Sequence, residues 1–121
     1  MLRNARPSPE TQLDALSERV VEMALSPAVG ARGLVSAVAA AHPEATLLDV
    51  AAAIARAAVS LEEAGAGAGE DRAAHLHRIA ALATIDAWTA ARRGWTDVRM
   101  GDLALYRRIH GSLRVEAPAH P

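Results

Sequence analysis

The sequence contains no cysteine, no lysine and no phenylalanine. Without cysteine the chain cannot form disulfides, thiolate nucleophiles or cysteine-ligated zinc sites. Without lysine it has neither the lysine of a Walker-type phosphate loop nor a side-chain amine for Schiff-base chemistry. These absences exclude several classes of enzyme before any motif is considered.

Long apolar runs are absent as well. No stretch reaches the roughly 18–20 uncharged residues that a membrane span needs. The first ten residues, MLRNARPSPE, have no apolar core of the kind found in a signal peptide. We therefore expect a cytoplasmic protein that does not enter a membrane.

Alanine is the residue that the sequence has in abundance, at about a quarter of the 121 residues. Alanine has the highest helix propensity, and the few aromatic and β-branched runs leave little material for a sheet. We predict an all-α fold, a compact bundle of four to five helices. The single domain is expected at 8–111, with a flexible N-terminal arm at 1–7 and a C-terminal tail at 112–121.

The segment 72–93 lies within the longest run of the sequence without glycine or proline. At 100° per residue its bulky apolar side chains drift around the helix, and alanines occupy the remaining side. A helix that is apolar all round is buried among several neighbours. We therefore predict that this helix is the central one and is enclosed on every side. Its bulky apolar residues are Leu76, Ile79, Leu82, Ile85 and Trp88.

Start and stop signals delimit the other helices. A serine–proline pair and apolar spacing of three and four predict a helix over 8–25. A shorter helix is expected from about residue 33 to the residue before Pro43. A capping-box pattern opens a helix over 46–63. The last helix is expected to start at either 96–97 or 102 and to end at Gly111.

The segment 64–69 alternates alanine and glycine and superficially matches a nucleotide-binding loop. A loop that cradles phosphate needs a strand before it and a helix N-terminus at a fixed distance. Here a helix precedes the glycines. We interpret the segment as a flexible connector.

Charge is nearly balanced overall, at a formal net of −1, but it is unevenly distributed. Residues 1–71 carry five arginines and ten acids, whereas residues 72–121 carry eight arginines and four acids. In one interpretation acidic helices pack beside basic helices within one bundle. In the other, the acidic face of one copy meets the basic face of a second copy in a symmetric dimer.

Two histidines near the start of the central helix suggest a metal site at first sight. His75 and His77 are two positions apart, so on a helix they point roughly 200° away from each other and cannot bind one metal together. Asp71 and His75 could supply two ligands, but no third ligand stands at helical spacing. We expect no metal and no cofactor.

The stretch 74–78, Ala-His-Leu-His-Arg, resembles the phosphorylatable stretch of histidine phosphotransfer domains. In that family Ala-His is followed by an apolar residue, a lysine and a glycine. The resemblance implies that His75 accepts a phosphoryl group and that Arg78 takes the place of the lysine. The sequence departs from the pattern at His77, where the family has an apolar residue, and at Ile79, where it has the glycine.

Nucleic-acid binding is a further alternative. A helix–turn–helix could be drawn around 42–44, but its second helix is rich in alanine and offers Arg56 alone to phosphates. The pI of about 6.5 is also untypical of a nucleic-acid-binding protein. The better electrostatic candidates lie in the C-terminal half, at Arg92, Arg93, Arg99, Arg107 and Arg108.

Asp86 is the one acid within the apolar part of the central helix, so it needs a partner if that helix is enclosed. An arginine or a tryptophan N–H is the expected partner, in a structural pair that fixes the helix register. Asp86 and His75 are the only candidates for catalysis. Nothing else in the sequence resembles a set of convergent catalytic groups.

The sequence therefore predicts a non-catalytic protein that acts through protein–protein association, either as a homodimer or as an adaptor or regulator bound to another protein. Phosphotransfer at His75 and nucleic-acid binding by the C-terminal arginines are the alternatives. Tryptophans serve both as core anchors and as interface hot spots. The expected interface residues are Trp88, Trp95, Arg92, Arg93, Arg107 and Arg108.

Overall fold

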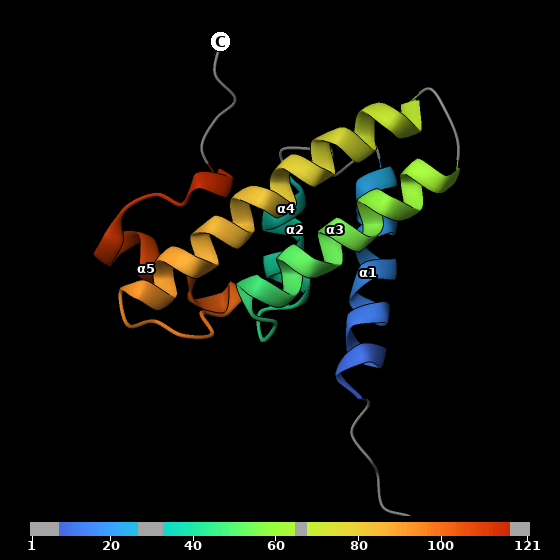
Figure 1. Cartoon of the computed structure of the whole chain (residues 1–121). Helices are drawn as coiled ribbons and strands as arrows, with labels where there is room; N and C mark the ends of the chain where they lie inside the picture. The colour runs from blue at the N-terminus through green and yellow to red at the C-terminus, as the bar shows by residue number, and fades with distance from the viewer. Residues whose placement is uncertain (1–7, 27–32, 65–67, 117–121) are drawn as a thin grey trace, which may run out of the picture.

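The computed structural model describes residues 8–26, 33–64 and 68–116 of the chain. It confirms the predicted all-α bundle (Figure 1). The predicted arm at 1–7 and the centre of the predicted connector, at 65–67, lie outside the described residues. The two ends of that connector, residue 64 and residues 68–69, are helical, so the prediction of a flexible segment is wrong there. The helices are α1 (Pro9–Leu25), α2 (Leu34–Ala41), α3 (Leu47–Ala64), α4 (Ala68–Arg92) and α5 (Leu103–His110), with 3-10 turns η1 (Met100–Asp102) and η2 (Arg114–Glu116).

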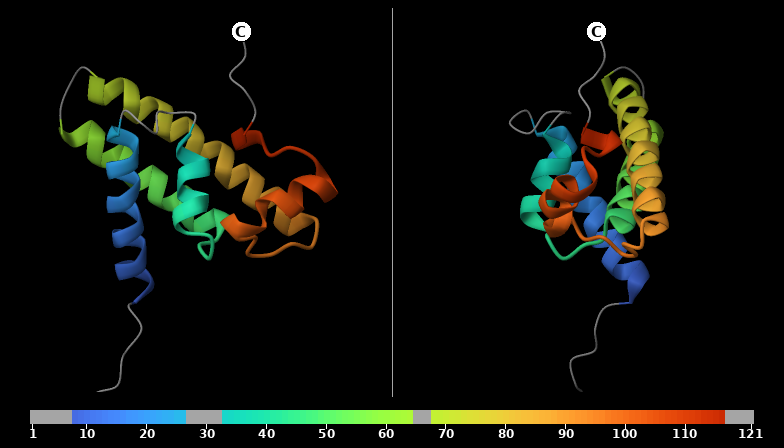
Figure 2. Two further views of the ribbon diagram at one scale, coloured as in Figure 1. Left: turned by 180° about the vertical axis from the view of Figure 1, so that it is seen from behind. Right: turned by 90° about the vertical axis from the view of Figure 1, so that its left-hand side faces the viewer.

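The helices form two layers. In Figure 1, α3 and α4 run side by side in front of α1 and α2, and their mutual contact is the most extensive in the described part of the chain. The right-hand view of Figure 2 shows α3 and α4 as one layer, with α1, α2 and α5 on the other side. The α3–α4 layer is therefore covered by other helices on one side only.

The core lies between these layers. Val20 of α1, Val38 of α2 and Ile54 of α3 have no exposed surface, and Leu76 of α4 is 3% exposed. Alanines are buried along both α3 and α4, and their small side chains allow two helix backbones to approach closely. These buried alanines are Ala51, Ala53, Ala57, Ala58, Ala73, Ala80, Ala83 and Ala90.

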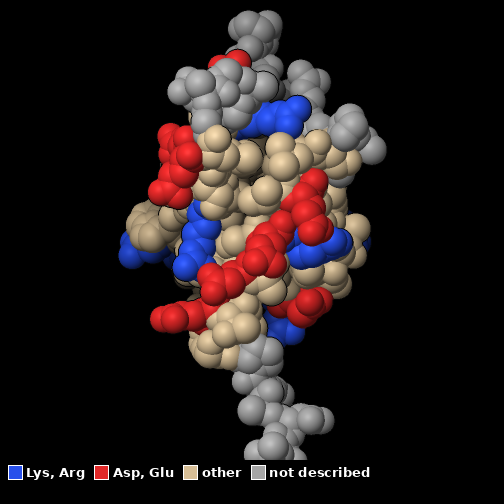
Figure 3. Space-filling view, turned by 90° about the vertical axis from the view of Figure 1, so that its right-hand side faces the viewer, with Lys and Arg blue, Asp and Glu red and all other residues tan. Residues whose placement is uncertain are grey.

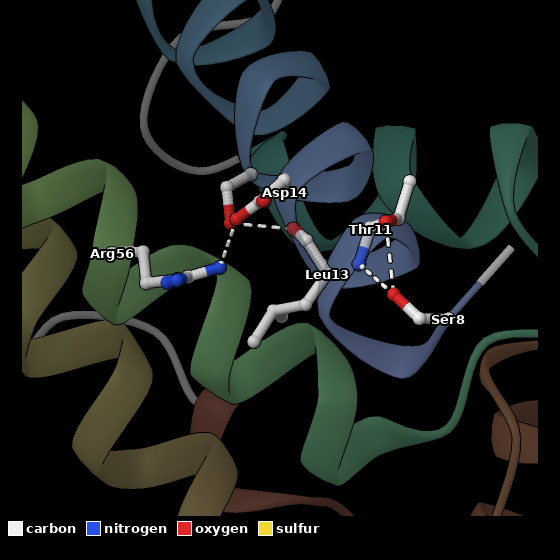
Figure 4. Close-up of polar contacts among 6 residues, drawn as sticks. Ser8, Thr11, Leu13, Asp14 and Arg56 are labelled. Carbon is white, nitrogen blue, oxygen red and sulfur yellow. Dashed lines mark hydrogen bonds and ion pairs between the residues drawn. The ribbon is translucent and has the colours of Figure 1, made fainter.

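The sequence signals for helix ends act as predicted. The Ser8 side chain accepts a hydrogen bond from the Thr11 N–H at 3.1 Å, in front of the proline that opens α1 (Figure 4). The Thr46 hydroxyl accepts one from the Asp49 N–H at 3.1 Å at the start of α3. Gly111 follows α5 with a φ of +91°, a backbone conformation that favours glycine.

Two loops pair with each other and fix where α5 begins. The turn between α2 and α3 runs beside the segment that follows α4, and backbone hydrogen bonds join them. This pairing satisfies backbone groups that neither loop could satisfy alone. The bonds run from Leu47 N–H to Val98 O, from Met100 N–H to Ala45 O and from Gly101 N–H to Pro43 O, each at 2.8 Å.

Gly101 has no room for a side chain where the two paired loops meet. A Cβ there would lie 3.1 Å from the Pro43 carbonyl oxygen and 3.2 Å from the Pro43 Cβ. We expect Gly101→Ala to lower the free energy of unfolding by about 1–3 kcal/mol, because the same oxygen is held by the Gly101 N–H. Thermal unfolding followed by circular dichroism measures the loss, with Ser112→Ala as an exposed control.

A higher melting temperature for Gly101→Ala would contradict this prediction. In an open position a glycine-to-alanine change stabilises a protein by about 0.4–1 kcal/mol, because it restricts the unfolded chain. The sign of the change in the free energy of unfolding therefore shows whether the two loops pack tightly at Gly101.

Candidate association surface

The central helix, α4, is not enclosed on every side. Leu76 and Ile79 are buried as predicted, but Ile85 is 44% exposed and Trp88 is 64% exposed. The prediction that these two side chains are buried is wrong. The physical reason is the two-layer architecture, in which the other helices cover one side of α4 and leave the opposite side open (Figure 2).

A contact between the side chains of α3 and α4 is the starting point for finding which residues lie on this open side. His77 of α4 lies 3.0 Å from a carboxylate oxygen of Glu62 of α3. Helical steps of three and four residues from this pair lead along both helices to further exposed apolar positions. We define the outer face as Leu48, Ala52 and Val59 of α3 with Ala81, Ile85 and Trp88 of α4, all of them exposed.

The outer face gathers most of the large apolar surface that the described residues leave in solvent. Of the seven large apolar side chains that are exposed, four lie on it: Leu48, Val59, Ile85 and Trp88. Single exposed apolar residues are ordinary, but several of them gathered on one side of two packed helices indicate an interaction site. The outer face is therefore the strongest candidate for a functional surface.

The sequence carried a signal for the α3 part of this surface that our interpretation missed. Leu48 and Val59 lie off the stripe of apolar residues that faces the core of α3, and they are eleven positions apart, close to three helical turns. They therefore share a second, outward stripe. When the apolar pattern of a helix is interpreted as one buried face, the core-facing stripe and the outward stripe are not distinguished.

Trp88 is held in its exposed position by its own helix. The guanidinium carbon of Arg92 lies 5.5 Å from the centre of the Trp88 ring. Such a cation–π contact contributes about 0.5–1 kcal/mol at an exposed site. It brings together two residues of the predicted interface set, and tryptophan and arginine are the residue types most enriched at interface hot spots.

The other predicted tryptophan has different surroundings. Trp95 is half-buried, with its ring centre 5.4 Å from that of Tyr106, and the His110 ring centre lies 4.8 Å from that of Tyr106. The Arg93 side chain donates a hydrogen bond to the Tyr106 hydroxyl at 3.0 Å. This aromatic cluster joins α5 to the end of α4, so Trp95 and Arg93 help to position α5.

Arg107 and Arg108, the last two predicted interface residues, are exposed in the final turn of α5. Cations in the last turn of a helix interact favourably with the helix dipole. The structure thus divides the six predicted interface residues into three places: the outer face, the aromatic cluster and the end of α5.

Asp86 lies on the core side of α4, where it is 5% exposed. Its carboxylate accepts hydrogen bonds from the backbone N–H groups of Arg114, at 2.9 Å, and Val115, at 2.8 Å. The predicted partner, an arginine side chain or a tryptophan N–H, is therefore corrected to two backbone groups. Leu113 is also buried, so the packed chain continues beyond residue 111, into the segment predicted as a tail.

Burial raises the pKa of the Asp86 carboxyl above its ordinary value. The two backbone N–H groups and the charge of Arg114 oppose this effect. Both carboxylate oxygens are occupied by backbone donors, so the side chain acts as an anchor for η2. This arrangement leaves no oxygen directed at a substrate.

The His75 side chain is exposed, as the phosphotransfer alternative requires. It is eleven residues from Asp86, which places the two about 16 Å apart along the helix axis. The two candidates for catalysis therefore do not converge. Among the described residues, no group of three His, Asp or Glu side chains could hold a metal ion.

Two hollows lie beside α1. One, of about 570 Å³, is lined by Asp14 and Arg56, which form an ion pair between α1 and α3 (Figure 4). The other, of about 650 Å³, lies between the first half of α1 and the α2–α3 turn. It includes His42, whose Nε2 is buried without a hydrogen-bond partner among the described residues.

Four acids of the acidic half of the sequence form an exposed stripe on α1. Figure 3 shows a diagonal band of acidic side chains on this side of the molecule. Of the ion pairs found among the described residues, Arg19–Glu22 and Arg56–Asp14 lie within the acidic half, and His77–Glu62 joins the two halves. The α1 stripe consists of Glu10, Asp14, Glu18 and Glu22, four positions apart.

Comparison of the chain with models of known protein families, with curated proteins and with solved structures finds no match. In the described part of the chain, no helix combines the length and the apolar character needed to cross a membrane.

Proposed function

We propose that the protein is non-catalytic and acts by protein–protein association through the outer face, including association with itself. The observation that carries this proposal is the exposure of Trp88 and Ile85 on the uncovered side of the α3–α4 layer. Burying a large apolar side chain gains about 1.5–3 kcal/mol. A surface with four such side chains gains from meeting another apolar surface.

The chemistry of the remaining candidates supports a non-catalytic role. Asp86 is committed to two backbone N–H groups, and the exposed His75 lies about 16 Å away from it along the axis of the same helix. General acid–base catalysis needs groups that converge on one reacting atom. The described residues offer no such arrangement around either side chain.

The test is the solution mass measured by light scattering over a series of protein concentrations. We expect a mass that rises from the 12.6 kDa of one chain towards twice that value. Trp88→Glu should weaken association by about thirtyfold or more, since it removes an aromatic anchor and adds a charge to an apolar surface. Leu105→Glu, on an α5 position that is 47% exposed, is the matched control.

Two outcomes would contradict the proposal. One is a monomeric mass for the unmodified protein over the whole concentration series. The other is an equal loss of association in Trp88→Glu and Leu105→Glu, which would assign the effect to added charge rather than to the outer face. Circular dichroism of both variants shows whether the helices remain folded.

Phosphotransfer is a second candidate, and the exposure of His75 favours it. If it is correct, incubation with phosphoramidate should add one acid-labile phosphoryl group, detected by mass spectrometry of the intact chain. His75→Gln should abolish the addition and His77→Gln should not. Equal labelling of unmodified protein and His75→Gln would eliminate this candidate.

A further inference from the structure

The exposed side of α4 carries a regular seam. Beginning at residue 74, exposed positions recur at alternating steps of four and three residues to the last turn of the helix. This spacing is the one by which two helices pack along a shared seam. The α4 seam consists of Ala74, Arg78, Ala81, Ile85, Trp88 and Arg92.

The α4 seam complements itself when a second copy runs in the opposite direction. About a two-fold axis midway between residues 81 and 85, Ile85 of one copy faces Ala81 of the other. Trp88 faces Arg78, and Arg92 faces Ala74. A bulky side chain thus meets a small one in two of the layers, and a cation meets an aromatic ring in the third.

The parallel arrangement lacks this complementarity. Each seam residue would then face its own copy, so Arg78 would oppose Arg78 and Arg92 would oppose Arg92. Like charges in contact at an interface are unfavourable. Ala81 facing Ala81 would also leave space, while Trp88 facing Trp88 would crowd the adjacent layer.

Charge at the two ends of α4 favours the antiparallel arrangement as well. Asp71 is exposed in the first turns of the helix, and Arg92 is exposed in its last turn. Antiparallel pairing brings Asp71 of one copy towards Arg92 of the other. It also sets the helix dipoles in opposite directions, which is the favourable alignment.

We infer that the occupant of the outer face is a second copy of this chain, whose α4 runs antiparallel to the first, with Ile85 on Ala81 and Trp88 on Arg78. The inference rests on the proposed association and names its partner and its geometry. On α3, Leu48 and Val59 flank the α4 seam and extend the area that pairing would bury.

Disulfide cross-linking tests this geometry, because the native chain has no cysteine to interfere. Ala81→Cys and Ile85→Cys are prepared as separate proteins, mixed in equal amounts and oxidised with oxidised glutathione. A disulfide needs Cα atoms about 4.4–6.8 Å apart, and the two positions are separated by about 6 Å along the helix. We expect the mixed 81–85 disulfide to form at least about fivefold faster than either homodisulfide.

Leu105→Cys is the control for random collision, and it should give no faster cross-linking than a disordered thiol peptide. The mixed disulfide is identified by intact mass, since the two variants differ in mass. Helical content before oxidation is checked by circular dichroism, so that an unfolded variant is not read as a geometric result.

The outcomes separate the geometry from the association. A dimeric mass with homodisulfides at 81 and 85 in place of the mixed product would overturn the antiparallel register and leave the proposed association intact. A dimeric mass without cross-linking at either position would place the interface elsewhere. A monomeric mass at all concentrations would overturn the association and this inference together.

Discussion

Replacing Ile54 by alanine is expected to lower the free energy of unfolding by about 3–4 kcal/mol. Ile54 has no exposed surface and is one of the largest fully buried side chains among the described residues. The change removes apolar surface from the core and leaves a cavity, because helices fixed by their other contacts relax only partly. A domain of this size has a total stability of roughly 6–18 kcal/mol, so the loss is a large fraction of the whole.

Urea denaturation followed by helical circular dichroism measures this loss. Ile54→Val should cost only about 0.5–1.5 kcal/mol, because the smaller change leaves a smaller cavity. Val59→Ala is the matched control, since it truncates a side chain on the same helix that is 44% exposed. All measurements use one low protein concentration, because association would raise the apparent stability.

Equal effects of Ile54→Ala and Val59→Ala would contradict the two-layer arrangement. In that arrangement one face of α3 is fully buried and the other is open. A large cost at Val59 in the monomer would mean that the outer face belongs to the core of the fold. It would then not be free to bind a second protein.

Asp86→Ala is expected to lower the free energy of unfolding by about 2–3 kcal/mol and to release the segment from Ser112 to Glu116. The carboxylate is the hydrogen-bond acceptor for the N–H groups of Arg114 and Val115. Hydrogen bonds to a charged group are worth more than neutral ones, and an unpaired buried donor costs about 1–3 kcal/mol. Amide hydrogen exchange at residues 114 and 115 should become faster by about tenfold or more.

The pH dependence of this anchor has a definite sign. Burial raises the pKa of Asp86 in the folded state, against the lowering effect of the backbone N–H groups of Val115 and Arg114. The folded state therefore holds the proton more tightly than the unfolded state does. The stabilisation that accompanies protonation is complete below about pH 4 and is lost as the pH rises through the folded-state pKa.

Asp86→Asn isolates this effect, because asparagine keeps the shape of the side chain and does not titrate. We expect the difference in free energy of unfolding between the unmodified protein and Asp86→Asn to fall as the pH rises through that window. Urea denaturation at a series of pH values measures it. A difference that grows with pH would show that the N–H groups outweigh burial and that the folded-state pKa is lowered.

The helices of this protein could be predicted because their signals are local. A serine before a proline, a threonine three residues before an aspartate and a glycine after a run of arginines act within one turn of the chain. Ser8, Thr46 and Gly111 are found at the helix ends that these signals predict. Alanine content and the scarcity of aromatic residues likewise predict the all-α class without reference to any distant contact.

The candidate site could be predicted only in part. Trp88 and Arg92 are predicted as interface residues from their residue types, and the structure brings the two side chains into contact on the outer face. Leu48 and Val59 are not among the predicted residues, because the apolar pattern of α3 was read for one buried face and their second stripe was not separated from it. Asp86 was recognised as a buried acid, but its partners lie 28 and 29 residues further along the chain.

The sequence by itself determined most of the helix ends of this protein and that its helices form a bundle; the start of α4, at Ala68 within the predicted connector, is an exception. Only the tertiary structure decided which side of α4 is covered, which loop pairs with which, and what binds Asp86. The physical reason is range: caps, propensities and periodicity act over a few residues, whereas burial depends on helices that are distant in the chain. Ile85 and Trp88 have the same apolar character as Leu76 and Ile79, and the position of α1, α2 and α5 alone leaves them in solvent.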